Sequence, residues 1–421
     1  MRIGFISTRF EGTDGVTLEA AKWAQVLEED GHETFWFAGK LDTPEATSFL
    51  FEEAFFGRPH ILALHEKLFG CTRRTRETTD EIHDIKHRCK DALYEFVEKF
   101  DLDLIIPQNI LAIPIHVPLG LAITEMMAET RIPTIAHHHD FYWERDRFSH
   151  TSVPEYLEMA FPPVIRGQYA NVVINSAGRS DMSRRRGLES TLIPNVFEFE
   201  SPPEENPHGA DLREEIGVAE DEVFVLQPTR VVNRKGIEHA IDLVRLMQKS
   251  KPERKIALVI SHDAGDEGFE YYENLIERAE EAKVRMLFIG DRISESREPG
   301  EDGRKRFSLW DVYPHADLVT YPSLYEGFGN AFLEALWFRK PVFINRYSIY
   351  IRDIEPHGFR VIDIDGVVTK RSVDAAWEIV EDQDKAERWA DHNYQLCLKH
   401  YSHTVLRKHL RGILAHLFPD L

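Results

Sequence analysis

Residues 321–334 read Tyr-Pro-Ser-Leu-Tyr-Glu-Gly-Phe-Gly-Asn-Ala-Phe-Leu-Glu. The apolar run 318–321 predicts a strand, the glycines that follow predict a turn, and the residues from Asn330 onward predict a helix. Such a junction directs backbone N–H groups and the positive end of the helix dipole toward a ligand, which suits a phosphate or a sugar oxygen. Glu326 precedes the turn and Glu334 lies about two helical turns later, so both carboxylates can accept hydrogen bonds from hydroxyl groups.

Short apolar runs alternate with amphipathic stretches on both sides of this segment, which is typical of β-α units around a parallel sheet. Residues 200–206 are acidic, contain prolines and lack apolar periodicity, which indicates a linker. We therefore predict two α/β domains, residues 1–198 and 207–395, and a C-terminal segment, residues 396–421, whose helix packs back on the first domain. The expected strands are 2–7, 34–37, 104–107, 134–138, 172–175, 191–193, 223–226, 256–260, 286–289, 318–321 and 342–345.

The charge balance restricts the kinds of partner. The 421 residues carry a formal net charge of -21, which would repel nucleic acids and anionic membranes. We therefore expect neither as a partner, and any anionic ligand must be held by a local cluster of arginines and lysines.

Cysteine usage and hydropathy predict a soluble, cytoplasmic protein. Cys71, Cys89 and Cys397 lack metal or redox spacing, so reduced thiols are expected. The most apolar stretch, 104–123, contains prolines and polar residues and is a poor membrane span. Met1 leads directly into a strand pattern rather than a signal peptide.

The context of the two glutamates resembles the signature of family-4 glycosyltransferases, a Glu, seven residues and a second Glu within Pro-Ser-x-x-Glu-Gly-Phe-Gly. This resemblance implies two Rossmann-like domains that face each other across a cleft, the GT-B type. It also implies that Glu326 contacts the transferred sugar as a catalytic residue and that Glu334 holds the nucleotide ribose. The donor would further meet the turn residues Gly327, Phe328, Gly329 and Asn330.

A second match lies in residues 228–236, Pro-Thr-Arg-Val-Val-Asn-Arg-Lys-Gly, which resemble the family's Arg-x-x-x-x-Lys-Gly segment. When the glycosidic bond breaks, the leaving diphosphate gains negative charge, which preorganised cations stabilise. The resemblance implies that Arg230 and Lys235 do this, with Arg234 beside them. It further implies a retaining, metal-independent transfer in which the nucleotide sugar is a substrate and no cofactor is needed.

The segment after the first strand, Phe-Glu-Gly-Thr-Asp-Gly-Val at 10–16, resembles the family's glycine-rich first loop. This implies that Gly12 and Gly15 meet the donor phosphate and that the loop edge meets the acceptor. The Gly-x-Gly-x-x-Gly fingerprint is absent, which disfavours NAD. Gly290 and Asp291, after a later strand, are further donor-binding candidates.

Residues 134–145 contain three consecutive histidines followed by Asp140. In the family a His-Asp pair at this strand end touches the donor sugar, which implies His139 as a catalytic residue. On a strand, His137 and His139 point one way and His138 the other, and no further ligand set is evident, so we expect no metal site.

The acceptor is expected to bind the first domain. Five basic residues lie between 73 and 88 in an otherwise acidic chain, which favours an anionic small molecule as acceptor, with a solvated basic helix as the alternative. The candidate acceptor-binding residues are Arg9, Asp14, Arg73, Arg74, Asn109, Asp140 and Trp143.

Residues 4–10 and 137–145 resemble enzymes of the family that mannosylate glucosylglycerate or its phosphate to make compatible solutes. The resemblance implies transfer of a hexose, for example from GDP-mannose, to an acceptor such as glucosylglycerate. A nucleotide-sugar epimerase or hydrolase and a non-catalytic nucleotide-sugar-binding protein stay open as alternatives. A homodimer is compatible with each of them.

Overall fold

The computed structural model describes residues 1–12, 14–204, 206–263, 269–294, 296–300 and 302–419. The chain divides into two compact units, Met1–Val196 with His403–Leu421 (unit 1) and Phe197–Ser402 (unit 2). The described part of the expected linker 200–206 therefore lies in unit 2; Glu205 is outside the described residues. The backbone N–H of Phe197 donates to the Tyr401 carbonyl, and Trp337 Nε1 donates to the Glu198 and Ser201 carbonyls. These contacts attach the segment to unit 2.

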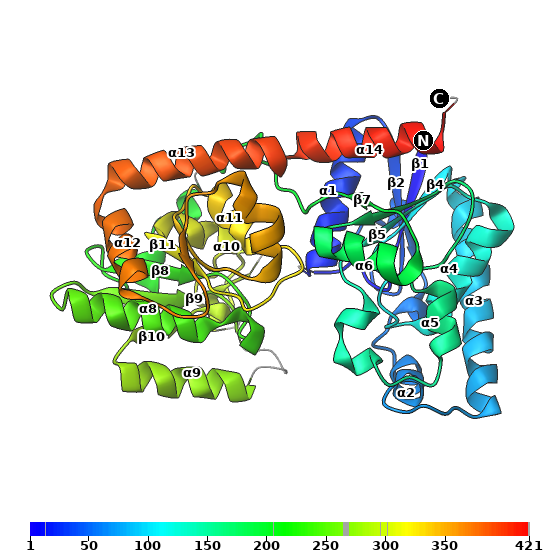
Figure 1. Cartoon of the computed structure of the whole chain (residues 1–421), viewed down its shortest axis with the longest axis horizontal. Helices are drawn as coiled ribbons and strands as arrows, with labels where there is room; N and C mark the ends of the chain where they lie inside the picture. The colour runs from blue at the N-terminus through cyan, green and yellow to red at the C-terminus, as the bar shows by residue number, and fades with distance from the viewer. Residues whose placement is uncertain (13, 205, 264–268, 295, 301, 420–421) are drawn as a thin grey trace. The chain divides into compact units, whose positions relative to one another are not determined.

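Unit 1 contains a parallel sheet with helices on both faces (Figure 1). In sheet order its strands are β3 (Ser48–Leu50), β2 (Glu33–Ala38), β1 (Arg2–Ile6), β4 (Leu104–Pro107), β5 (Thr134–His138), β6 (Tyr169–Val173) and β7 (Thr191–Leu192). Its helices are α1 (Gly15–Glu29), α2 (Pro59–Leu68), α3 (Arg76–Phe100), α4 (Val117–Thr130), α5 (Pro154–Ala160), α6 (Ser176–Arg186) and α14 (His403–Leu417).

The two faces of this sheet have separate apolar cores. Ile3 and Phe5 of β1 pack in a core with residues of α1 and α14. The opposite face packs on α3 and α4. A Cβ atom at Gly4 would lie 2.5 Å from the Leu102 side chain and 2.8 Å from the Phe96 ring, so a larger residue there would displace these side chains.

The last helix, α14, belongs to unit 1. Figure 1 shows α14 beside α1, and Arg411 donates two hydrogen bonds of 2.8 Å to Asp30. The return begins at His403 rather than at residue 396, because α13 packs on α11 and α12 of unit 2 as far as its last turn.

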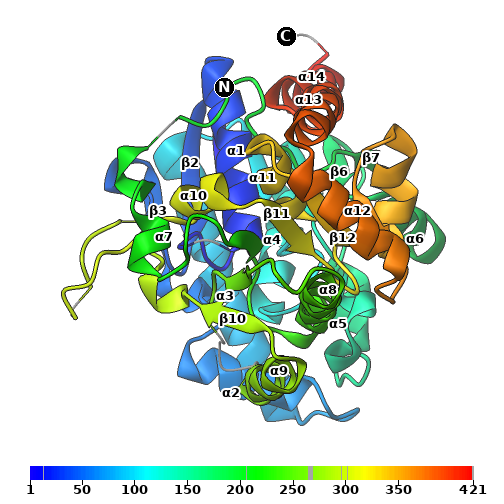
Figure 2. The same ribbon diagram turned by 90° about the vertical axis from the view of Figure 1, so that its left-hand side faces the viewer.

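Unit 2 contains a second parallel sheet. In sheet order its strands are β10 (Arg285–Phe288), β9 (Ile256–Ile260), β8 (Val223–Gln227), β11 (Leu318–Tyr321), β12 (Val342–Asn345) and β13 (Ile362–Ile364). Its helices are α7 (Leu212–Glu215), α8 (Ile237–Ser250), α9 (Phe269–Ala282), α10 (Leu309–Val312), α11 (Asn330–Trp337), α12 (Lys370–Glu381) and α13 (Gln383–His400). Helix α8 packs against α9 and α12 on one face of the sheet (Figure 2).

Both sheets follow the Rossmann strand order, in which the first strand lies between the second and the fourth. The chain therefore reverses its direction of winding between β1 and β4 in unit 1, and between β8 and β11 in unit 2. Ligands of open α/β sheets bind where the carboxyl ends of such strands diverge. A binding site is therefore expected at the loops that follow these four strands.

Candidate active site

The loop after β8 carries the predicted cations of unit 2. The short 3-10 helix η6 (Asn233–Lys235) ends at Gly236, whose φ of 60° is left-handed. An added Cβ atom at Gly236 would lie 2.4 Å from the carbonyl oxygen of Pro322 in the loop after β11. The backbone N–H of Leu324 also donates to the Arg234 carbonyl at 2.8 Å. Glycine is therefore needed here for the two loops to touch.

Glu326 lies at this junction and binds two cations. Lys235 Nζ donates to Glu326 Oε1 at 2.5 Å, and Arg234 donates to Oε2 at 2.7 Å. The side chains of Lys235 and Glu326 are only 11% and 9% exposed, so the pair is largely removed from water. Lys235 and Glu326, which belong to two separate sequence motifs, are thus in direct contact. Arg234 binds the second oxygen of the same carboxylate.

Burial changes the proton affinity of this cluster. Burial lowers the pKa of Lys235, with Glu326 opposing the shift and Arg234 and Arg230 adding to it. Burial acts to raise the pKa of Glu326, but Lys235 and Arg234 outweigh it, so that pKa is lowered. The glutamate is therefore ionised at neutral pH. Arg230 is exposed beside this cluster.

The other predicted donor residues follow β11 and begin α11. Glu334 accepts a 2.9 Å hydrogen bond from the buried Tyr313 hydroxyl. Phe328 is 3% exposed and its ring packs on Tyr401, so only its backbone faces the turn. At Gly329, φ is 137° and a Cβ atom would lie 2.5 Å from the Tyr347 hydroxyl. Gly327 is exposed, and Asn330, half-buried, is the first residue of α11.

The loops after β9 and β10 meet at Gly290, where a Cβ atom would lie 2.4 Å from the backbone nitrogen of Asp263. Asp291 is exposed and pairs with Arg304 at 3.2 Å. Next to Asp263, burial together with Arg230 and Lys235 lowers the pKa of His262 to about 4. His262 is therefore close to the cations, although it is not among the predicted site residues. Its position two residues after the end of β9 was the available signal.

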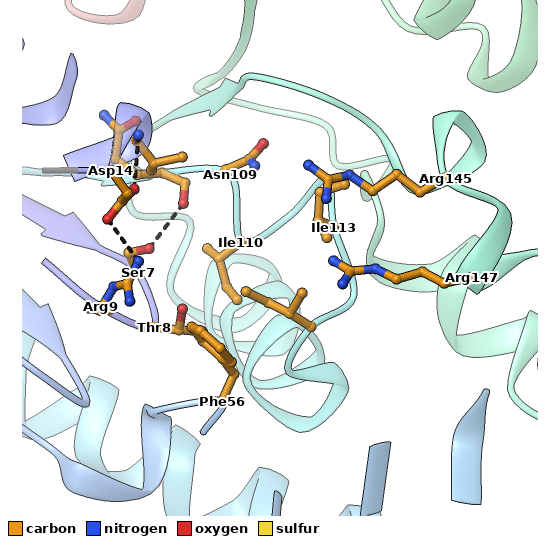
Figure 3. A pocket seen from close by; sticks show the side chains of 13 residues that line it. Ser7, Thr8, Arg9, Asp14, Phe56, Asn109, Ile110, Ile113, Arg145 and Arg147 are labelled. Carbon is orange, nitrogen blue, oxygen red and sulfur yellow. Dashed lines mark hydrogen bonds and ion pairs between the residues drawn. The ribbon is translucent and has the colours of Figure 1, made fainter. Parts of the chain in front are cut away.

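Unit 1 has its own pocket at the corresponding point, between the ends of β1 and β4 (Figure 3). Its volume is ≈ 150 Å³. Its lining consists of Ser7, Thr8, Arg9, Asp14, Val16, Phe56, Gln108, Asn109, Ile110, Ile113, Ile115, Arg145 and Arg147. Three of the predicted residues line this cavity: Arg9, Asp14 and Asn109. A fourth, Asp140, lies beside it and accepts a hydrogen bond from the lining residue Arg145.

The glycine-rich loop forms one wall of this pocket. Asp14 caps α1 by accepting from the backbone N–H groups of Val16 and Thr17, and it pairs with Arg9 at 3.0 Å. Gly12, with φ of 76°, donates its N–H to Asp42 at 2.9 Å. Gly15 is the first residue of α1. Asp14 therefore orients both the helix and Arg9.

The His-Asp pair lies beside the pocket, bonded to two of its lining residues, Asn109 and Arg145. Asn109 donates to Asp140 at 2.8 Å and accepts the backbone N–H of His139 at 2.9 Å. Arg145 donates to the same aspartate through Nε at 2.7 Å. Asp140 is thereby held in one orientation directly after β5.

The three histidines are separated by the strand alternation. His137 bonds Gln108 at 2.9 Å and its ring lies 4.4 Å from that of His139, whereas His138 bonds Asn171 at 3.0 Å. Burial lowers the pKa of His139 to about 4, so this imidazole is neutral at neutral pH. Across the described ranges, no group of three or more His, Cys, Asp or Glu side chains is arranged to hold a metal ion.

Three predicted acceptor residues lie elsewhere. Arg73 is exposed, and Arg74 donates to the Ser152 carbonyl at 2.5 Å and pairs with Glu155. Trp143 stacks on Phe141 and lines a neighbouring cavity. Arg145 and Arg147, from the segment after β5, line the pocket instead, and neither is among the predicted site residues.

Two curated relatives align with nearly the whole chain. It is 30% identical to the mannosylglucosylglycerate synthase of Thermotoga maritima, with 96% of this chain and 97% of that protein covered. It is 33% identical to the mannosylglucosylglycerate synthase of Petrotoga mobilis, with 86% of each covered. The chain belongs to this family of glycosyltransferases.

The family model "Glycosyl transferases group 1" matches residues 301–396 of the glycosyltransferase, a range that includes Glu326 and Glu334. Among solved structures, Anabaena Alr3699/HepE in complex with UDP and glucose superposes with a TM-score of 0.66 at 17% identity, covering 99% of this chain and all of that one. The predicted family and the predicted GT-B fold class are thereby confirmed. Within the described residues, no helix of the glycosyltransferase is long and apolar enough to cross a membrane.

Proposed function

We propose that the protein transfers a hexose from a nucleoside-diphosphate hexose to a small hydroxylated acceptor, with retention of the anomeric configuration. The observation that carries this proposal is the binding of Lys235 and Arg234 to the buried carboxylate of Glu326. Cations fixed in advance at a partly dry site are suited to a leaving diphosphate, because they need no reorganisation when its charge develops.

The predicted site residues of unit 2 have separate roles. Lys235 and Arg230 stabilise the leaving diphosphate in place of a divalent cation. Glu326 holds the cations in the unliganded protein and accepts a hydrogen bond from a hydroxyl of the transferred sugar. Glu334 accepts from the ribose hydroxyls of the nucleotide.

In unit 1, neutral His139 hydrogen-bonds the donor sugar. Asp140, fixed by Asn109 and Arg145, faces the acceptor. The leaving phosphate takes the proton of the attacking hydroxyl.

The identities of the substrates are proposed from the relatives. Both are named mannosylglucosylglycerate synthases, and a synthase of that product joins a mannosyl group to glucosylglycerate. We therefore propose mannose as the transferred hexose, GDP-mannose as its donor and glucosylglycerate as the acceptor.

Thermal unfolding with UDP, GDP, ADP and CDP in turn, in the presence of EDTA, tests the donor site without an acceptor. A ligand that binds only the folded protein raises its stability by about 2.7 kcal/mol at 100 times the dissociation constant. We expect GDP to raise the unfolding temperature. No shift with any of the four would overturn the donor site.

Product analysis separates transfer from its alternatives. With GDP-mannose and glucosylglycerate, we expect a new α-glycoside by NMR, since the donor is an α-glycoside and retention keeps that configuration. Consumption of the donor without an acceptor would instead indicate an epimerase or a hydrolase. Binding without any consumption would indicate a nucleotide-sugar-binding protein.

A further inference from the structure

Two arginines enter the unit 1 pocket from the same side. Arg145 and Arg147 follow β5: Arg145 lies between two short 3-10 helices, η3 (Tyr142–Glu144) and η4 (Asp146–Phe148), and Arg147 lies within η4. Figure 3 shows both side chains extending in parallel, with their guanidinium groups directed into the cavity, while Arg9 and Asp14 lie on its other side. A pair of parallel guanidinium groups offers several N–H donors to the oxygens of one anion.

The lining of the cavity is rich in arginine. Arg9, Arg145 and Arg147 line it together with a single carboxylate, that of Asp14. Asp14 pairs with Arg9, and Arg145 pairs with Asp140 beside the cavity. Three arginines in one lining, in a chain whose net charge is -21, favour an anionic group at this position over a neutral one.

The rest of the lining limits the size and chemistry of the ligand. Ile110 and Ile113, 2% and 3% exposed, supply an apolar wall, and the hydroxyls of Ser7 and Thr8 supply small polar groups. A carboxylate or phosphate on a chain of a few carbons fits a space of ≈ 150 Å³.

From this arrangement we infer that Arg145 and Arg147 bind the anionic group of the acceptor, a carboxylate or a phosphate monoester on a short hydroxylated chain, and that Arg147 sets the preference for charged over neutral acceptors. The inference rests on the transferase function proposed above and adds the residues that select the acceptor. Arg145 also holds Asp140. Arg147 is therefore the residue to change, because its replacement leaves that aspartate in place.

The test compares three acceptors with the full-length protein in the presence of GDP. They are the glucoside of glycerate, the same compound carrying a phosphate, and the matching glucoside of glycerol, which lacks an anionic group. Binding of each is measured by calorimetry for the wild type, Arg147→Gln and Arg147→Lys. The control is Arg166→Gln, an exposed arginine before the amino-terminal end of β6.

We expect the wild type to bind at least one charged glucoside more tightly than the neutral one. Arg147→Gln should weaken that binding about 10- to 100-fold, as for a lost hydrogen bond between charged groups, and leave neutral binding unchanged. Arg147→Lys should recover part of the loss, and Arg166→Gln should match the wild type. The charged glucoside that binds more tightly shows whether the site prefers a carboxylate or a phosphate.

The inference is overturned if the wild type binds charged and neutral glucosides equally, binds neither, or loses nothing in Arg147→Gln. Hexose transfer to the same glucosides is measured in parallel. Transfer that does not depend on acceptor charge would contradict the role of Arg145 and Arg147 but would still support the transferase function. Charge-dependent binding without any transfer would remove the proposed function and keep the anion site.

Discussion

Lys235 and Glu326, 91 residues apart in sequence, are joined by a 2.5 Å hydrogen bond because β8 and β11 are neighbours in the sheet. The carboxylate also binds Arg234, so a single anion balances two cations before any donor arrives. A donor diphosphate brings more negative charge than this carboxylate. It can therefore take over the cations without a net loss of ion pairing.

Replacing Lys235 with alanine should lower kcat by about 10²- to 10³-fold, as for the loss of one group that stabilises a developing anion. Steady-state transfer from the nucleotide sugar measures it. Lys249→Ala removes an exposed lysine from the last turn of α8 and should leave kcat unchanged. Equal rates in both variants and the wild type would show that Lys235 does not stabilise the leaving group.

Replacing Glu326 with glutamine should separate donor binding from transfer. The amide keeps the shape but loses the charge that neutralises Lys235, so GDP should bind at least as tightly as in the wild type while turnover falls. The unliganded variant should lose about 3 kcal/mol of stability, since one partner of a buried ionic cluster is gone. Thermal unfolding with and without GDP measures both effects. Loss of GDP binding in a folded variant would mean that Glu326 mainly positions the cations.

Two glycines allow a matched test of the contact between the loops. Gly236 and Gly187 have similar φ angles of 60° and 64°, but a Cβ atom would meet Pro322 only at Gly236 and nothing within 4 Å at Gly187. Gly187→Ala should cost about 1 kcal/mol for the left-handed backbone. Gly236→Ala should cost more and also lower kcat, because the loops must separate. Urea unfolding and transfer rates measure this, and equal effects in the two variants would count against the close approach.

The sheets were largely predictable from the sequence. β4, β5, β9, β11 and β12 have the predicted bounds, and every residue of these five strands is buried, as in strands covered on both faces of a parallel sheet. The missed strands, β3 and β13, have three residues each. Strands this short give too little pattern to separate from a loop.

The candidate site was predictable only in part. The motifs selected Lys235 and Glu326, but their contact depends on strand order. Arg73 and Arg74 are predicted to bind an anion because basic residues cluster in this part of an acidic chain. Helix α3, which they precede, has 25 residues and is therefore about 37 Å long. That length far exceeds the strands beside it and carries its start away from the strand ends.

Arg145 and Arg147 could not be recognised from pattern alone. They lie in irregular turns whose direction is set by the packing of Phe141 and Phe148, both 1% exposed. Which way an arginine points from such a segment depends on which neighbouring aromatic ring is buried. Hydrophobic periodicity does not contain that information.

His138 should make folding stability depend on pH. Burial, only partly compensated by the hydrogen bond that His138 Nε2 donates to Asn171 Oδ1, lowers its pKa to about 4, against about 6.5 in an unfolded chain. Between these values the unfolded chain binds the additional proton. Stability is therefore complete above pH 6.5 and decreases as the pH falls toward 4. At pH 5 this residue alone should cost about 2 kcal/mol relative to pH 7.5.

His138→Gln removes the titrating group and keeps a side chain that can bond Asn171. Urea unfolding at pH 7.5 and pH 5 should therefore show a smaller loss of stability in the variant, by about 2 kcal/mol. Other buried histidines, including His116 and His139, have pKa values lowered in the same way, so the variant should still lose some stability. An identical loss in the wild type and the variant would mean that His138 is already protonated in the folded protein at pH 5. The neutral state inferred for the adjacent His139 would then need direct measurement by NMR titration.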